Sequence, residues 1–332
     1  MKKLISLFLV TTVLLMCLSV PAMAESEAHL LRIGELSYLN ADDASRTALM
    51  ENMRAFLAAA GAGNLFDNAD SLEMKEYDNL NAMQMGLSAG EIDAMLVPTA
   101  VGGMLAYFNP DSYYLAFSDR NGNENTEAAT DFSNPYILLL HLANDSVFGT
   151  DFSFLMTAEN TALKEAFDGA ISAMKEDGTL SALTDQIYSE AISAVEMPVI
   201  DGAETIRVAV TGDLPPYDYI EASGKPAGFN TAILAEISKR IGKQFELVSI
   251  ESAARAIALS SGSADVVFWT RVSSPDASQY DVDMVSEEIQ TIYDGIIEQT
   301  ATLRDPSMDV PDGTILTVPY LHEMLILVFP AK

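Results

Sequence analysis

The sequence predicts an α/β fold made of two lobes with mostly parallel sheets. Three observations support this prediction. Strand-like and helix-like runs alternate through residues 205–269, the run that ends at Trp269 is almost entirely apolar, and the second half of the chain repeats motifs of the first. Alternating strands and helices build parallel sheets through right-handed crossovers. A parallel strand that is covered on both faces is apolar along its whole length.

Three pairs of similar segments occur in the same order in the two halves. "LLRIGELSYLN" (30–40) pairs with "TIRVAVTGDLPPYDY" (205–219), "LSAGEIDAMLV" (87–97) with "LSSGSADVVFW" (259–269), and "FSNPY" (132–136) with "LTVPY" (316–320). The offsets are 175 residues from Arg32 to Arg207, 172 from Gly90 to Gly262, and 184 from Tyr136 to Tyr320. The common order and the similar offsets indicate duplicated units.

The elements of the second copy, residues 205–332, follow one another at short intervals. Residues 206–210 form a β-type run, and an apolar residue at every fourth position marks a helix, at Phe229, Ile233, Ile237 and Ile241. Asn230 is expected to cap this helix, and Gly242 to end it. A strand over 245–250, a short helix over 253–260 and a strand over 265–269 are expected to follow.

The first copy, residues 29–195, ends in two predicted helices. Residues 160–195 carry two amphipathic stripes that are broken at Asp177-Gly178. Residues 196–204, "EMPVIDGAE", form the expected linker to the second copy. The polar loop "SDRNGNENTE" (118–127) is expected to be a solvated turn, because its glycine falls at the fourth position counted from Asp119 and a calcium loop requires it at the sixth.

The first 24 residues are expected to be a signal peptide. Lys2 and Lys3 precede the apolar run 4–20, and Ala22-Met23-Ala24 has the small residues of a signal-peptidase site. The apolar run is short for a bilayer span, and an uncleaved anchor is the alternative. The only cysteine, Cys17, lies in this leader, so the mature chain would hold no thiol and no disulfide. We therefore expect a secreted or extracytoplasmic protein.

The charge of the chain excludes several kinds of partner. The formal net charge is −30, and without Lys2 and Lys3 the remaining 16 basic residues face 48 acidic ones, a net charge of about −32. Such a charge repels nucleic acid and anionic lipid. The histidines are too far apart in the sequence to form a metal-binding motif; they are His29, His141 and His322. No metal and no cofactor are expected.

One long stretch of the second copy resembles a known family. "GDLPPYDYIEASGKPAGFNTAILAEISKRIGKQFELV", joined to "SGSADVVFW", is similar to the family-3 extracellular solute-binding proteins, the periplasmic-type receptors of ABC importers. The first copy resembles the family more loosely, through "AGEIDAML", "FSNPY" and "ALKEAFDGAISAMKEDGTL". The resemblance implies a type 2 periplasmic-binding-protein-like fold in a monomer. It also implies capture of a small polar solute, an amino acid or an amine-like molecule, for the membrane subunits of an ABC importer.

The resemblance points to five candidate ligand-binding residues. In the family, a Pro-Pro-aromatic turn after the first strand and the residues at the end of the third strand line the cleft, which indicates Tyr217, Trp269 and Thr270. Open α/β sheets place ligands at these strand ends, and an aromatic ring there supplies a flat apolar face. Asp213 is a turn former or a partner for a ligand amine. Arg271 either reaches the pocket or lies at the surface.

Two departures from the family pattern limit what the resemblance implies. Members that bind amino acids carry an arginine shortly after the third strand, which holds the ligand carboxylate, but "SSPDAS" (273–278) has Ala277 at that place. Both copies also look like a first lobe without its second lobe. We therefore expect two reduced lobes that share one cleft and close around the solute. An enzyme on the same scaffold, such as a dehydratase or a lyase, and an accessory module that binds a partner protein are the alternatives.

Overall fold

The structure, a computed structural model, describes residues 31–36, 72–109, 111–115, 149–189, 194–251, 254–272 and 310–331. Four sequence predictions lie outside these residues: the signal peptide, the loop at 118–127, the first-copy motif at 132–136, and the role of Ala277. Within the described residues, no helix is long and apolar enough to cross a membrane.

The first copy begins with a small parallel sheet. Its elements are β1 (Leu31–Leu36), β2 (Leu72–Tyr77), α3 (Leu80–Ser88), β3 (Ala94–Pro98), α4 (Thr99–Phe108) and β4 (Tyr113–Leu115). Strand β1 lies between β2 and β3 and is parallel to both. The rest of the described first copy consists of β5 (Gly149–Thr157), α7 (Thr161–Glu176) and α8 (Thr179–Ser189). The two helices predicted between residues 160 and 195, with a break at Asp177-Gly178, are confirmed.

The second copy repeats the parallel arrangement. Its main elements are β6 (Thr205–Val210), α9 (Phe229–Ile241), β10 (Gln244–Ser249), α10 (Arg255–Ser260), β11 (Val266–Val272), β12 (Thr314–Leu316) and β13 (Leu321–Pro330). Strand β6 lies between β10 and β11 and is parallel to both. A separate three-stranded sheet is formed by β7 (Asp213–Leu214), β8 (Asp218–Ile220) and β9 (Pro226–Ala227). The strands and helices predicted for this copy are confirmed, with bounds shifted by a few residues.

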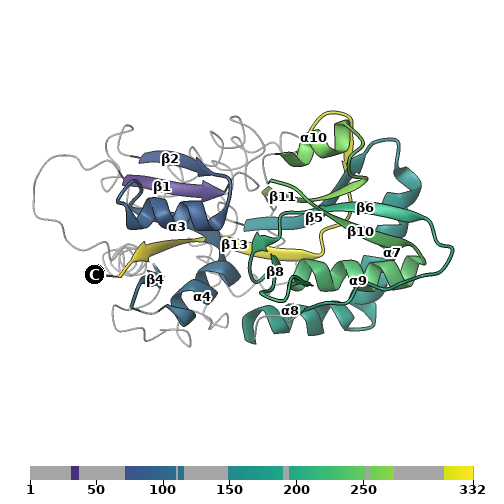
Figure 1. Cartoon of the computed structure of the whole chain (residues 1–332), viewed down its shortest axis with the longest axis horizontal. Helices are drawn as coiled ribbons and strands as arrows, with labels where there is room; N and C mark the ends of the chain where they lie inside the picture. The colour runs from purple at the N-terminus through teal and green to yellow at the C-terminus, as the bar shows by residue number, and fades with distance from the viewer. Residues whose placement is uncertain are drawn as a thin grey trace, which may run out of the picture.

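Two antiparallel strands join the parallel groups into one ten-stranded sheet. The main order is β10-β6-β11-β5-β13-β3-β1-β2, with β12 beside β5 and β4 beside β13. Strand β13 pairs with β5 over residues 321–324 and with β3 over residues 325–328. Strand β13, yellow in Figure 1, runs from β5 to β3 and β4, all of them strands of the first copy. The predicted α/β class is confirmed, and the last strand of the chain connects the two groups.

The segments that pair in the sequence have the same local geometry. The backbone N–H of Arg32 donates to Asp93 Oδ2 at 2.9 Å, and its guanidinium Nη2 donates to Oδ1 at 2.8 Å. Arg207 and Asp265 make the same two bonds, both at 2.8 Å. Each of these arginine–aspartate clamps fastens the first strand of its copy to the start of the third. The partner of Tyr320 in the third pair of segments lies outside the described residues.

Helices α7 and α8 pack against α9 of the second copy. Asp177, which follows α7, accepts a hydrogen bond from the Thr179 backbone N–H at 3.0 Å and one from Arg240 Nη2, on α9, at 2.8 Å. The described residues of the segment 196–204 form no helix or strand. The division into domains at this segment stays a prediction, and elements on both sides of it are in contact.

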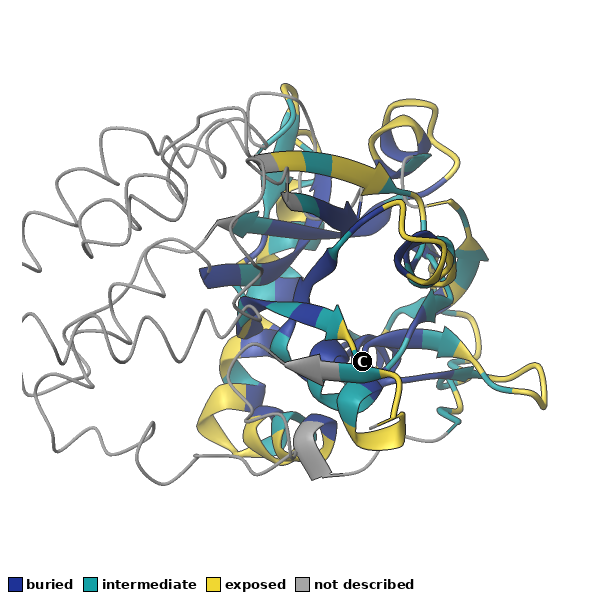
Figure 2. Cartoon of the chain, turned by 90° about the vertical axis from the view of Figure 1, so that its left-hand side faces the viewer, coloured by how far each residue is buried: buried dark blue, intermediate teal, exposed yellow. Residues whose placement is uncertain are grey.

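The strands of the second copy are covered on both faces, as the apolar run before Trp269 predicts. Val208, Val210 and Phe268 belong to a core cluster that also includes residues of α7 and α9. Ala209, Val267 and Trp269 belong to a second cluster that includes residues of α10. Figure 1 shows α10 on the opposite side of these strands from α7 and α9. Figure 2 shows the buried residues concentrated on the strands and on the helix faces that touch them.

The start of α9 differs from the prediction. The residue that precedes the helix is Gly228, with φ of 100°, and Asn230 is the second residue of the helix. The prediction that Asn230 caps the helix is wrong. Instead, the turn before the helix supplies the cap: the carbonyl oxygens of Pro216 and Tyr217 accept the N–H groups of Phe229 at 3.0 Å and Asn230 at 2.7 Å. The predicted end of the helix at Gly242, with φ of 66°, is confirmed.

Candidate functional site

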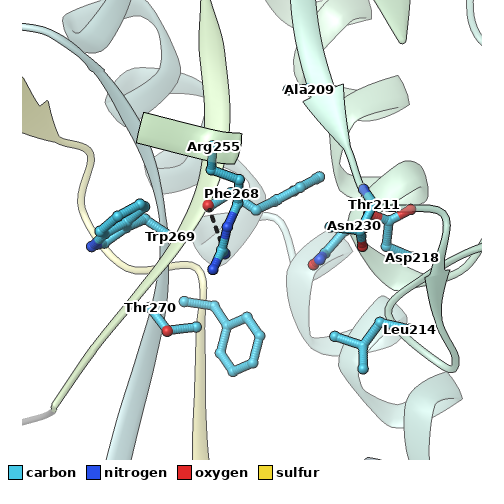
Figure 3. Close-up of a pocket in the computed structure, with 10 residues that line it drawn as sticks. Ala209, Thr211, Leu214, Asp218, Asn230, Arg255, Phe268, Trp269 and Thr270 are labelled. Atoms are coloured by element: carbon cyan, nitrogen blue, oxygen red, sulfur yellow. Dashed lines mark hydrogen bonds between the residues drawn. The ribbon is translucent and has the colours of Figure 1, made fainter. Parts of the chain in front are cut away.

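A pocket lies where β6 ends, beside the middle of β11 and at the carboxyl edge of the parallel pairing between these two strands. Its volume is about 20 Å³, and the space reaches about 380 Å³ only when the adjoining open solvent is included. The lining residues come from β5, β6, β7, β8, α9, α10 and β11 and from the turn after β6; they are Phe152, Ala209, Thr211, Leu214, Asp218, Asn230, Arg255, Phe268, Trp269 and Thr270. Figure 3 shows Arg255, Trp269 and Thr270 on one side of this space and Thr211, Asp218 and Asn230 on the other.

Asp218 is the acidic residue of the pocket and is only 4% exposed. Its Oδ2 accepts the backbone N–H of Thr211 at 2.9 Å and the hydroxyl of the same residue at 3.3 Å, and Oδ1 accepts the N–H of Gly212 at 3.1 Å. Burial raises the pKa of Asp218 from 3.8 to about 6, against the opposing effect of these hydrogen bonds. The carboxylate therefore closes the turn after β6 and gives the pocket a negative charge near neutral pH.

Arg255 supplies a buried positive charge to the same pocket. The residue is 5% exposed, and its Nη1 donates to the Phe268 carbonyl oxygen at 3.3 Å. Its guanidinium carbon lies 5.3 Å from the centre of the Trp269 ring, a cation–π contact. These contacts hold the side chain between α10 and β11. The pocket thus has a guanidinium on one side and a carboxylate on the other.

The side chain of Asn230 does not cap α9 and instead lines the pocket. It is 3% exposed, and its Oδ1 accepts a hydrogen bond from the Tyr320 hydroxyl at 3.0 Å. Tyr320 is also buried and lies directly before β13. Burial raises the pKa of Tyr320 well above its ordinary value, and the charge of Asp218 adds to this effect.

Two of the five predicted site residues line the pocket. Trp269 and Thr270 are 5% and 6% exposed and lie on β11 at the end of the apolar run. Trp269 is also the only tryptophan of the chain. Contact of either residue with a ligand stays a prediction.

The other three predicted site residues are not among the lining residues. Tyr217 is fully buried, with its ring 5.0 Å from that of Phe152, and its carbonyl oxygen caps α9. Asp213 is half-buried on β7, and burial raises its pKa. Arg271 Nη2 lies 3.5 Å from Asp151 Oδ2 on β5. Any contact of these three side chains with a ligand also stays a prediction.

Thr211, Asp218, Asn230 and Arg255 were not expected in the site. Asp218 lies next to Tyr217 in the same turn, and Asp213 was chosen there because it comes first after the strand. Asn230 was assigned to a cap that the chain makes from backbone carbonyl groups. Arg255 did carry a signal: it is a basic residue in the short apolar helix "RAIALS" of a strongly acidic chain. A charge at such a position requires a buried partner or a ligand.

The lining combines polar and apolar groups around one space. Phe152, Leu214 and Phe268 supply apolar surface, and the two buried charges and Asn230 supply polar contacts. Among the described residues, no group of three or more potential metal ligands lies together.

The sheet defines the class of the protein, an α/β fold with the pocket at the carboxyl edge of its parallel strands. Within this class, residues 206–287 match the sequence profile of the bacterial extracellular solute-binding proteins, family 3. The match covers the strands, helices and pocket residues from β6 to β11, and it confirms the resemblance predicted from the sequence. Comparison of the sequence with curated proteins gives no match.

Solved structures of similar shape share little sequence with the chain. One is the ligand-binding component of an ABC-type import system from Staphylococcus aureus with zinc bound (8% identity, 91% of this chain and 66% of that chain covered, TM-score 0.38). A second is Tv2483 bound to L-arginine (8% identity, 91% of this chain and 77% of that chain covered, TM-score 0.36). A third is a pheromone cOB1 precursor/lipoprotein of the YaeC family from Enterococcus faecalis (12% identity, 90% of this chain and 84% of that chain covered, TM-score 0.38). The chain thus spans about two thirds of the first of these proteins.

Proposed function

We propose that the protein is an extracytoplasmic receptor that captures a small polar solute, an amino acid or an amine-like molecule, and delivers it to the membrane subunits of an ABC importer. The observation that carries the proposal is the pocket itself. It lies in the segment that matches the solute-binding family, and it places Trp269, Arg255 and Asp218 around one space.

The charges of the pocket support a polar solute. A molecule with an amine can approach Asp218, and one with a carboxylate can approach Arg255, whereas the walls of Phe152 and Phe268 contact its carbon skeleton. A charge-assisted hydrogen bond to a buried partner is stronger than the same bond in water. The pocket is therefore expected to bind an amino acid or an amine more tightly than an apolar molecule.

Capture without chemical change is part of the proposal. Asp218 is the only carboxylate among the described lining residues, and both of its oxygens accept hydrogen bonds from its own turn. A general base needs a carboxylate that can approach the substrate proton within hydrogen-bond distance. A residue that closes a turn is better suited to hold a ligand than to exchange protons with it.

A thermal-shift screen tests this proposal. Amino acids, polyamines and sugars are added to the purified protein, and a captured solute raises the melting temperature, because it binds only the folded state. At 100 times the dissociation constant, the gain is about 2.7 kcal/mol of unfolding free energy. The emission of Trp269, the only tryptophan, is expected to change with the same compound.

Variants connect the effect to the pocket. Trp269→Ala is expected to weaken binding at least tenfold, and Trp269→Phe and Thr270→Val serve if the alanine variant does not fold. Phe108→Ala is the control, since Phe108 is 64% exposed at the end of α4 and is not a lining residue. Protection by no compound, or protection that survives in all three pocket variants, contradicts the proposal.

A further inference from the structure

We propose that Tyr320 is a positioning residue that turns the amide nitrogen of Asn230 toward the pocket, so that Asn230 and Arg255 together select solutes with a carboxylate-type acceptor group. This inference rests on the proposed function. It decides between the two kinds of solute, amino acids and amines, that the proposed function leaves open.

Tyr320 is held too firmly to move its hydroxyl away from Asn230. Its ring stacks on Phe154, with centroids 4.8 Å apart, and also contacts Phe229 at 6.1 Å. Its backbone N–H donates to the Phe152 carbonyl oxygen at 2.9 Å. The residue is 3% exposed, and such aromatic contacts fix a ring in one orientation. The hydroxyl keeps its proton over the whole physiological range, because burial raises the pKa of Tyr320 well above 10.

This donor decides which way the Asn230 amide faces. An asparagine side chain has one carbonyl oxygen and one NH2 group, and here the oxygen accepts the Tyr320 hydroxyl at 3.0 Å. The NH2 group therefore lies on the other branch of the amide. The backbone of Asn230 is fixed as well, since its N–H donates to Tyr217 at 2.7 Å. Figure 3 shows the end of the Asn230 side chain directed into the space between the walls.

Arg255 offers a second set of donors to the same space. A guanidinium carries N–H donors and no acceptor, and Phe268 and Trp269 hold this one with its end toward the pocket. Both donor-bearing side chains are at least nine-tenths buried, with 3% exposure for Asn230 and 5% for Arg255. A carboxylate has two oxygens, so it can accept from both walls. An amine has no acceptor for these two side chains, and the guanidinium repels its positive charge, so of the charged lining groups it can pair only with Asp218.

Matched pairs of probes test the selection. L-arginine and agmatine, L-ornithine and putrescine, L-lysine and cadaverine, and L-phenylalanine and phenethylamine each differ by one carboxylate. Each member is titrated calorimetrically into the full chain. In every pair that binds, the amino acid is expected to bind at least tenfold more tightly than the amine. This discrimination ratio is the quantity that the variants are designed to change.

Tyr320→Phe removes only the hydroxyl, so the Asn230 amide can turn over. The discrimination ratio is expected to fall at least threefold, whereas a merely structural role would weaken both members of a pair equally. Tyr219→Phe is the matched control, since Tyr219 is half-buried on β8 and is not a lining residue, and its ratio should equal that of the wild type. Asn230→Asp, which replaces the NH2 donor with an acceptor, is expected to reverse the preference toward the amine.

The outcomes separate the two proposals. If amines bind as tightly as amino acids, or if only a sugar protects the protein, the selection is wrong and the receptor function stands. If Tyr320→Phe weakens both members of a pair equally, the positioning role is wrong. If no probe and no compound of the wider screen binds, the receptor function fails, and the inference fails with it.

Discussion

Asp218 and Arg255 are both buried, with 4% and 5% exposure, in a chain whose net charge is −30. A buried charge is retained only where nearby groups offset its lost hydration. Asp218 has the donors of the turn after β6, and Arg255 has the Phe268 carbonyl and the face of Trp269. The acidic surface attracts cations in general, so the buried arginine is the local feature that admits an anionic group.

The burial of Asp218 predicts an unusual pH dependence of stability. Because its pKa rises from 3.8 to about 6 on folding, the folded state binds this proton more tightly than the unfolded state. The contribution of Asp218 to stability is therefore fully present below pH 3.8 and is lost as the pH rises through about 6. The free energy of unfolding of the wild type, minus that of Asp218→Asn, is expected to fall by at most about 3 kcal/mol between pH 4 and 7. Urea unfolding at several pH values measures this difference.

Asp177 supplies a control of opposite sign. The hydroxyl and the backbone N–H of Thr179, together with Arg240, lower the pKa of Asp177 to about 2. Its contribution to stability is present above pH 3.8 and is lost as the pH falls toward 2. The difference between the wild type and Asp177→Asn is therefore expected to stay constant between pH 4 and 7. A constant difference for Asp218→Asn as well would contradict the effect of burial at that site.

At the scale of single elements, helix α9 connects the turn, the core and the pocket. The Pro-Pro-Tyr turn ends the strand, because proline cannot donate to a ladder, and the carbonyl oxygens of Pro216 and Tyr217 then cap α9. Asn230, whose N–H makes one of these capping hydrogen bonds, reaches the pocket and Tyr320 with its side chain. The capped start of the helix therefore fixes a residue of the site.

Gly228→Ala is expected to destabilise the protein by about 3–5 kcal/mol. Gly228 has φ of 100°, and a Cβ at this position would lie 2.5 Å from the Tyr217 carbonyl oxygen and 2.9 Å from that of Pro216. These backbone atoms cap the helix and cannot move away without breaking the cap. The midpoint of urea unfolding measures the loss, and any fraction that folds should also bind solute more weakly.

Gly242→Ala measures the cost of a positive φ alone, without the contact between a new Cβ and backbone atoms that Gly228→Ala would also create. Gly242 also has positive φ, 66°, but a Cβ there meets no atom within 4 Å. The expected loss is only the cost of the left-handed conformation, about 1–2 kcal/mol. Equal losses for the two glycines would show that the contact with the turn is unimportant.

The helices and strands were predictable, whereas most of the pocket was not. Apolar residues at every fourth position gave α9, and two amphipathic stripes gave α7 and α8, because packing of one helix face depends mainly on local periodicity. The role of Asn230 depends on a partner far away in the sequence, Tyr320, which lies 90 residues beyond it. Trp269 was predictable because the resemblance to the solute-binding family points to the end of the apolar run 265–269.

At the scale of the whole molecule, the two copies share a scaffold but differ in the side chains at the positions that correspond to the pocket residues. At the sequence offsets of 175 and 172, Gly34 corresponds to Ala209, Met83 to Arg255 and Val97 to Trp269. A Cβ on Gly34 would lie 3.0 Å from Met83 Cγ, so Met83 packs directly against this glycine. Met83 and Val97 are fully buried. Among the described residues, the place of the buried arginine and tryptophan is thus filled by apolar packing in the first copy.

The shared sheet predicts that the two copies unfold together. One core cluster contains Ile33 and Leu96 of the first copy as well as Val208 and Phe245 of the second, and β13 of the second copy pairs with β3 and β5 of the first. Asp93→Asn and Asp265→Asn each weaken one arginine–aspartate clamp, because an amide offers a single acceptor oxygen. Both variants are therefore expected to lower the melting temperature of one and the same calorimetric transition.

The effects of the two clamp variants are expected to add in the double variant, since the clamps share no partner. Glu196→Gln is the control: its ion pair with Lys225 is exposed on both sides, and such pairs contribute little. Two calorimetric transitions, each shifted by only one clamp variant, would instead mean that each copy folds alone. In that case β13 would be a late contact between finished units, and a pocket held by Tyr320 would depend on their docking.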